Sequence, residues 1–99
     1  MAQRKITWTK QAIRDFNAAI EYIRSNSEQS ADTFKEKLLD KIGSLAEDKI
    51  VHRKDPFKKN NDGNYLYFEF LRYRIVYYAK TDEVFIIRVR HTSREPKKY

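Results

Sequence analysis

The spacing of the apolar residues changes near residue 48 of this 99-residue chain. Up to that point apolar side chains recur every three or four positions, which is typical of helices that bury one face. Beyond it they alternate with polar residues or form short runs rich in aromatic and β-branched types, which is typical of strands. The sequence therefore predicts an α+β protein in which the helices precede most of the sheet.

Two helices are predicted after a short first strand at residues 4–8. Thr9 follows this strand and is a suitable N-cap for a helix over residues 10–25, and Ser27 or Ser30 caps a second helix. The apolar stripe of the first helix consists of Ala12, Ile13, Phe16, Ala19, Ile20 and Ile23. That of the second consists of Ala31, Phe34, Leu38, Ile42, Leu45 and Ala46. The short break between the helices predicts an antiparallel hairpin.

Three strands are predicted after the helices, over residues 65–70, 73–79 and 83–91, and the simplest arrangement for them is a meander. The expected order of elements is β-α-α-β-β-β. Each helix has an apolar stripe that needs a partner, so we expect an antiparallel sheet with the helical hairpin on one face. The length is that of a single domain spanning residues 1–99.

Strict alternation along the strands assigns each side chain to one face of the sheet. The face under the helices is predicted to hold Leu66, Phe68, Phe70, Ile75, Tyr77, Phe85, Ile87 and Val89. The opposite face is predicted to hold Tyr65, Tyr67, Glu69, Arg74, Val76, Tyr78, Arg88 and Arg90. The second face is basic and aromatic, a composition suited to single-stranded RNA, although cross-strand pairing alone also accounts for it.

The formal charge of +7 indicates a polyanionic partner: RNA, DNA or an acidic protein segment. The basic residues gather in two runs, 49–60 and 88–99, each with five Lys or Arg, although surface lysines that keep a protein in solution are an alternative explanation. Without cysteine, and with only His52 and His91 as histidines, the chain is not expected to bind a metal. No apolar run approaches the roughly 18 residues of a membrane span, and we expect a cytoplasmic protein.

Several segments together resemble the RelE/ParE toxin superfamily over essentially the whole chain. They are Trp8 at the end of the first strand, the segment YRIVYYAKTDEVFIIRVRH at residues 73–91, and the basic tail at residues 94–99. The resemblance implies the toxin of a type II toxin–antitoxin system, neutralised by a cognate antitoxin that covers its basic surface. RelE-like and YoeB-like members cut messenger RNA on the ribosome without a cofactor, whereas ParE-like members share the fold and poison DNA gyrase.

The resemblance also suggests catalytic residues for the nuclease branch. Arg74 matches an arginine that stabilises the phosphate, and the loop at residues 55–63 matches one that carries a general base, which would be Asp55. His91 and Tyr99 are candidates for the acid that protonates the leaving oxygen. The candidate RNA- and phosphate-binding residues are Lys58, Lys59, Tyr65, Tyr67, Arg88, Arg90 and Arg94.

Each catalytic candidate also has a structural interpretation. Asp55 with Pro56 is an ordinary turn pair, Arg74 can pair with Glu69 across the sheet, His91 can simply end a strand, and Tyr99 can be a frayed terminus. Moreover, tyrosines stand at positions 65 and 67, where RelE-like nucleases carry lysines. The sequence therefore favours a ribosome-dependent mRNA endonuclease only slightly over a gyrase inhibitor. A non-toxic RNA- or protein-binding module is the third alternative.

Overall fold

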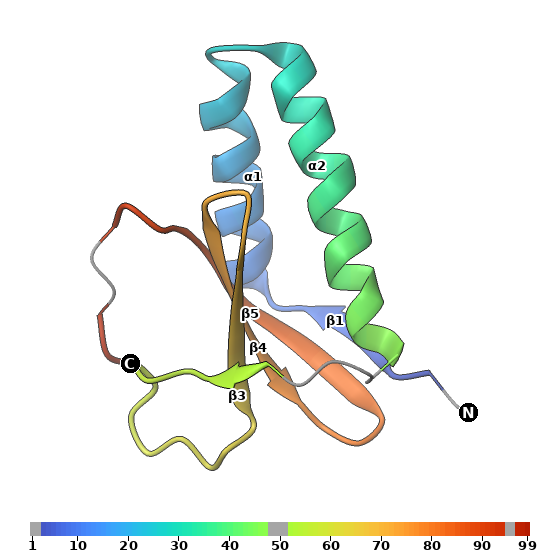
Figure 1. Ribbon diagram of the computed structural model, residues 1–99, viewed down its shortest axis with the longest axis vertical. Coiled ribbons are helices and arrows are strands. Elements are labelled where there is room, and N and C mark those ends of the chain that lie inside the picture. Colours follow the sequence, from blue (N-terminus) through green and yellow to red (C-terminus); the bar gives the residue numbers. More distant parts are fainter. Residues whose placement is uncertain (1–2, 48–51, 95–96) are drawn as a thin grey trace.

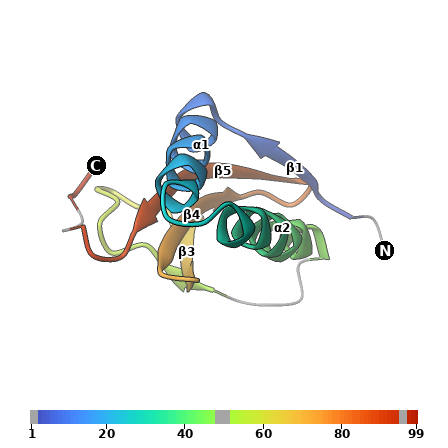
Figure 2. The ribbon, with the colours of Figure 1, turned by 90° about the horizontal axis from the view of Figure 1, so that it is seen from above.

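The computed structural model describes residues 3–47, 52–94 and 97–99. The elements in chain order are β1 (Lys5–Trp8), α1 (Lys10–Arg24), α2 (Glu28–Gly43), a 3-10 turn (Ser44–Glu47), β2 (Arg53–Lys54), β3 (Tyr65–Phe70), β4 (Tyr73–Ala79) and β5 (Glu83–His91). The two helices form an antiparallel hairpin that covers one face of a five-stranded sheet (Figures 1 and 2). The predicted α+β class, order of elements and helical cover are confirmed.

Side-chain caps set where each helix begins. The Thr9 hydroxyl accepts a hydrogen bond from the Ala12 amide at 3.2 Å, as predicted. The Ser27 hydroxyl accepts one from the Ser30 amide at 3.1 Å, so Ser27 is the cap of α2. The second apolar stripe continues past the end of α2, because Leu45 lies buried in the 3-10 turn.

The sheet order is β1-β5-β4-β3-β2. Strands β2 to β5 pair antiparallel, and the bounds predicted for β3, β4 and β5 are confirmed. Two features were not predicted: β1 joins β5 in parallel, and the two-residue β2 pairs with β3. A strand as short as β2 has too few residues to show an alternating pattern.

The core lies between the helical hairpin and the sheet. It consists of Ala12, Phe16, Ala19, Ile20, Ala31, Phe34, Leu38, Ile42, Leu45, Phe68, Tyr73, Ile75, Tyr77, Val84, Ile86 and Val89. Ile13 was predicted in the buried stripe of α1, but it is 45% exposed. Position 13 lies at the edge of the apolar stripe, on a side of the helix that faces away from the sheet.

An irregularity in β5 changes which of its residues face the helices. Val76 pairs with Arg88 and Tyr77 with Ile86, so Ile87 is an extra residue between the two pairs. The prediction that Phe85 and Ile87 pack under the helices was therefore wrong. Val84 and Ile86 are buried there instead. The predicted alternation between the two faces of the sheet holds again at Val89, which is buried as predicted.

None of the helices in the described part of the chain is long and apolar enough to span a membrane.

Candidate functional site

Asp55 lies on the sheet face opposite the helices, directly after β2. It is 2% exposed, and its backbone amide donates to the carbonyl of Tyr65 at 2.8 Å, which extends the pairing of β2 with β3. A buried carboxylate is costly unless its oxygens are bonded. The surroundings of this side chain therefore decide what it can do.

Both oxygens of the Asp55 carboxylate accept hydrogen bonds. Arg74 Nη2 donates to Oδ1 at 2.7 Å, and the Phe57 amide donates to the same oxygen at 3.1 Å. The Tyr99 hydroxyl donates to Oδ2 at 2.5 Å. We call Asp55, Arg74 and Tyr99 the buried triad after the carboxylate at its centre; Tyr99 as a whole residue is 38% exposed. Residues from three separate segments meet in it: the loop after β2, the strand β4 and the C-terminal tail.

The Arg74 side chain is held on several sides. Its guanidinium carbon lies 3.7 Å from the ring centroid of Tyr67 and 4.9 Å from that of Phe57. Arg74 and Glu69 are opposite each other in the β3–β4 register, but the ion pair that Arg74 makes is with Asp55. The side chain of Arg74 is 11% exposed, and that of Asp55 is 0% exposed.

Tyr99 reaches the site because the tail pairs with the loop after β2. The Lys59 amide donates to the carbonyl of Tyr99 at 2.6 Å, and the Tyr99 amide donates to the carbonyl of Phe57 at 2.9 Å. Figure 1 shows the C-terminal residues beside this loop. Tyr99 is therefore not a frayed terminus. Burial, and then the hydrogen bond to Asp55, raise the pKa of its hydroxyl above 10.0, so it is protonated at neutral pH.

The loop after β2 is organised by Asn61, which sequence analysis did not single out. Its side-chain oxygen accepts from the amides of Gly63 and Tyr65, and its nitrogen donates to the carbonyls of Asp55 and Tyr65. An asparagine with this role has no signal beyond the NNDG turn composition. Gly63 has φ of 98°, a conformation that favours glycine.

Five cationic side chains, Arg74 among them, line a cavity of about 230 Å³ beside the buried triad. It is lined by Asp55, Phe57, Arg74, Val76, Arg88, Arg90, Lys97, Lys98 and Tyr99. Val76 was predicted to lie on this face, where the loop and the tail now bury it. Lys97 and Lys98 were not predicted as site residues, although they belong to the basic run at 88–99.

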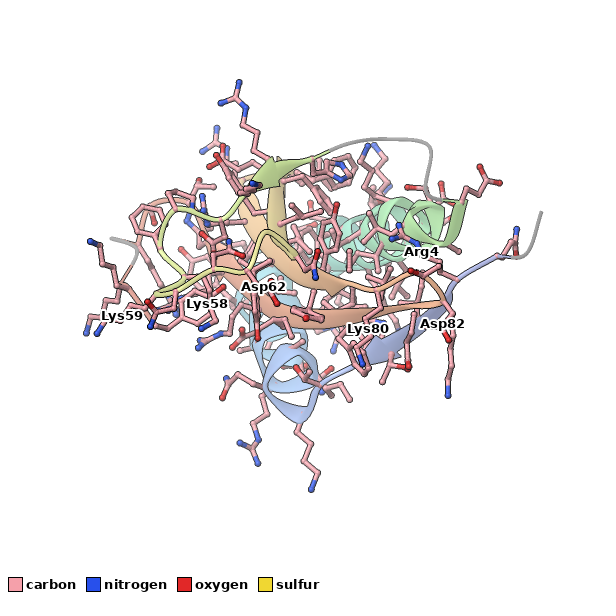
Figure 3. All side chains as sticks on the ribbon, turned by 90° about the horizontal axis from the view of Figure 1, so that it is seen from below. Arg4, Lys58, Lys59, Asp62, Lys80 and Asp82 are labelled. Carbon is pink, nitrogen blue, oxygen red and sulfur yellow. The ribbon has the colours of Figure 1, made fainter. Side chains whose placement is uncertain are left out.

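The other predicted binding residues are spread over the loop and the sheet. Lys58 Nζ lies 4.9 Å from the ring centroid of Tyr65 and 5.4 Å from that of Tyr99, so it covers both rings. Lys59 is exposed, and with Lys58 it lies at the end of the molecule away from Arg4 (Figure 3). Residues 49–51 of the first basic run and 95–96 of the tail lie outside the described residues.

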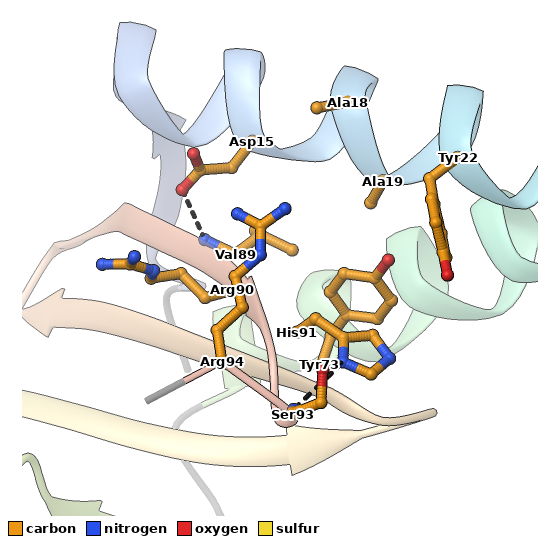
Figure 4. A pocket seen from close by; sticks show the side chains of 10 residues that line it. All are labelled: Asp15, Ala18, Ala19, Tyr22, Tyr73, Val89, Arg90, His91, Ser93 and Arg94. Carbon is orange, nitrogen blue, oxygen red and sulfur yellow. Dashed lines mark hydrogen bonds between the residues drawn. The ribbon is translucent and has the colours of Figure 1, made fainter. Parts of the chain in front are cut away.

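His91 is not brought to Asp55. Its Nδ1 lies 2.7 Å from the Ser93 hydroxyl, and its ring meets that of Tyr73 edge-on at 5.1 Å. It lines a different cavity, between α1 and the end of β5, together with Arg90 and Arg94 (Figure 4). The four catalytic candidates thus divide into the buried triad and a separate histidine.

His52 packs against the sheet. Its Nδ1 lies 2.5 Å from the Tyr77 hydroxyl, and its ring lies 4.9 Å from that of Phe68. Burial, and then the charge of Lys41, lower the pKa of His52 below 6.5. Within the described part of the chain no group of three histidine, aspartate or glutamate side chains is placed to hold a metal ion.

Comparisons with known proteins relate this arrangement to one family. A family model described as the ParE toxin of type II toxin-antitoxin system, parDE, matches residues 6–96. The fold is similar to a chain of the chromosomal ParDE TA system from P. aeruginosa (TM-score 0.71, 15% identity, 90% of this chain and 96% of that chain). It is also similar to the YoeB dimer from Staphylococcus aureus (TM-score 0.52, 22% identity, 91% and 98%). No curated protein matches the sequence.

Proposed function

Because the chain belongs to the ParE toxin family of type II toxin–antitoxin systems, we propose that it acts by binding and inhibiting DNA gyrase rather than by cutting messenger RNA. A toxin of this kind has an antitoxin as its partner. The observation that supports the proposal is the inaccessibility of Asp55, whose side chain is 0% exposed. Gyrase is the target that the resemblance to ParE-like members implies, and we propose that the chain meets it in the cytoplasm.

An RNA-cleaving site needs a base whose oxygen can approach the 2′-hydroxyl of the substrate. Both Asp55 oxygens are already bonded, to Arg74 and the Phe57 amide on one side and to Tyr99 on the other. To reach RNA the carboxylate would have to leave its partners, and separating a buried ion pair costs about 3–5 kcal/mol. In this conformation the buried triad joins the loop and the tail to the sheet, which is a structural role.

The cationic groups around the triad suit a toxin that binds its target. Lys97 and Lys98 are exposed, and they line the same cavity as Arg90 on a chain of net charge +7. Positive potential of this kind speeds the encounter with an acidic protein or with the DNA that gyrase holds. We assign the exposed Lys97 and Lys98 of the tail, with the neighbouring Arg90, to target binding.

The mRNA endonuclease is the second candidate, and one observation favours it. Asp55, Arg74 and Tyr99 line one cavity with Arg88 and further cations. If the loop and the tail open on the ribosome, Asp55 would take the 2′-hydroxyl proton, Arg74 would stabilise the phosphate and Tyr99 would protonate the leaving oxygen. His91 has no role in this version, because it lies in another cavity.

The double variant Asp55→Asn with Arg74→Gln distinguishes gyrase inhibition from cleavage of messenger RNA. Arg74→Ala alone is a poor test, since it leaves the Asp55 carboxylate buried without its cation. The double variant removes both charges together and keeps hydrogen-bonding groups at both positions. We expect cells that express it to show the same DNA damage as cells with the wild-type chain, and intact messages in both.

The measurements are DNA breaks and mapped 5′ ends of messenger RNA, minutes after induction. A thermal melt of the purified variant checks that it folds. New 5′ ends within translated frames in the wild type, absent in a folded double variant, would establish the nuclease and remove the gyrase proposal.

A further inference from the structure

The turn between β3 and β4 is built from residue types that its backbone conformation disfavours. Leu71 and Arg72 are its two residues, between the end of β3 and the start of β4 (Figure 1). Their φ angles are 51° and 70°, and a two-residue hairpin turn with positive φ at both positions normally holds Asn-Gly or a similar pair. A leucine and an arginine are strained in this conformation. Strain of this kind is retained where the side chains have a function.

Packing within the fold does not account for Leu71. It is 43% exposed and lies outside the cluster of buried and partly buried hydrophobic residues that forms the core. Phe70 belongs to that cluster, so the apolar contacts of this strand with the core end one residue before the turn. An asparagine would fit the turn better at little loss of packing. The leucine therefore offers an exposed apolar side chain to a partner.

Arginines lie around this exposed leucine. Arg72 is next to it, and the Thr92 amide donates to the Arg72 carbonyl at 2.8 Å, which joins the turn to the segment after β5. Arg90, Thr92 and Arg94 line a small cavity with Glu69 at this end of the sheet. Within residues 3–47, 52–94 and 97–99, the three arginines form no ion pair with a carboxylate. One glutamate therefore stands against three arginines, and the surface around the turn is positive.

We propose that this turn binds double-stranded DNA, with the Leu71 side chain inserted between two base pairs from the minor groove and with Arg72 and Arg94 on the flanking phosphates. Apolar wedges, leucine among them, open base steps in this way in proteins that kink DNA. A narrow minor groove also concentrates negative potential, which attracts arginine. The inference rests on the proposed function and deepens it, because the DNA is the segment that gyrase holds.

The aromatic rings beside the turn favour a duplex over a single strand. Single strands are bound by stacking their bases on exposed rings. Tyr73 is 6% exposed with its ring against those of Phe34 and His91, and Phe70 packs against the core. A leucine has no flat face for a base, but it can fill the gap between two separated base pairs. An apolar pocket on a protein would also accept a leucine, but three arginines without carboxylate partners favour a polyanion.

Leu71→Asn tests the proposal, with Leu39→Asn as the control. Leu39, on α2, is 40% exposed, so both variants replace a similarly exposed leucine by asparagine. The probes are two short labelled duplexes, one fully paired and one with a single central mismatch, at which base pairs separate at lower cost. Binding of the purified full chain is measured by fluorescence anisotropy over a range of salt concentrations, and a thermal melt is recorded for each variant.

We expect the wild-type chain to bind the mismatched duplex at least about fivefold more tightly than the paired one. In Leu71→Asn this preference disappears, whereas the dependence of the affinity on salt stays the same because the arginines remain. Leu39→Asn keeps the preference. The melting temperature of Leu71→Asn stays at or above that of the wild type, since asparagine is favoured in this turn.

A preference that persists in Leu71→Asn, or that the wild type lacks, would overturn the proposal. So would a lower melting temperature of Leu71→Asn, which would mean that the leucine is retained for packing. Weaker binding of Leu71→Asn to gyrase without DNA, with the duplex preference intact, would assign the turn to a protein contact instead. A supercoiling assay with the wild type tests the proposed function separately: inhibited gyrase without a duplex preference would remove only the DNA wedge.

Discussion

Tyr99 connects the tail to the sheet through a single hydroxyl. Its hydrogen bond to Asp55 is one of the three contacts that make burial of that carboxylate tolerable. Loss of the hydroxyl would leave Oδ2 buried and without that donor. Burial first, and then this contact, raise the pKa of Tyr99, and a raised pKa means that the stabilisation is fully present below pH 10.0 and is lost as pH rises above it.

Tyr99→Phe is therefore expected to lower the free energy of unfolding at pH 7 by about 1–3 kcal/mol, the cost of an unsatisfied buried acceptor. The measurement is urea denaturation at pH 7 and again above pH 10, where the difference between variant and wild type should shrink. Tyr22→Phe is the control, because Tyr22 is 66% exposed. Similar losses in the two variants would mean that the tail is not held by this contact.

At the scale of elements, Asp15 completes the edge of β5 beyond β1. It accepts hydrogen bonds from the backbone amide of Val89 and from Arg88. A helix side chain thus provides an acceptor that a neighbouring strand would otherwise provide. Asp15→Ala should lower the free energy of unfolding by about 1–3 kcal/mol, since the Val89 amide loses its partner. The control Asp32→Ala removes the same charge from an exposed position of α2. Unfolding curves that do not distinguish the two variants would contradict this account.

Local pattern predicted the elements well where a whole segment carried it. The three long strands had the predicted bounds because each held six or more residues of one pattern. The bulge at Ile87 could not be predicted from local pattern. It changes which residues of β5 face the helices, but it does not change the composition of the strand. Likewise, β2 pairs through only Arg53 and Lys54, and its place depends on the strand beside it.

The candidate site was predictable as a set of residues but not as an arrangement. Asp55, Arg74 and Tyr99 were all named from the sequence, and the structure brings them together. Their contacts join positions up to 44 residues apart, which no local pattern encodes. His91 was named only as an alternative to Tyr99 for the acid, and the end of β5 places it near α1.

At the scale of the whole molecule, the net charge is +7, and part of the positive charge lines two cavities that share Arg90. One adjoins the buried triad and the basic tail, and the other lies against α1. We infer that the first serves the target.

The most direct test of the central claim uses the purified wild-type chain in two parallel assays: supercoiling by DNA gyrase, and cleavage of a messenger RNA on translating ribosomes. The account predicts inhibition of gyrase at toxin concentrations that leave the message intact, because Asp55 is inaccessible to RNA. A message cut on the ribosome while gyrase remains active would contradict it, and would mean that the loop and the tail open to expose the buried triad.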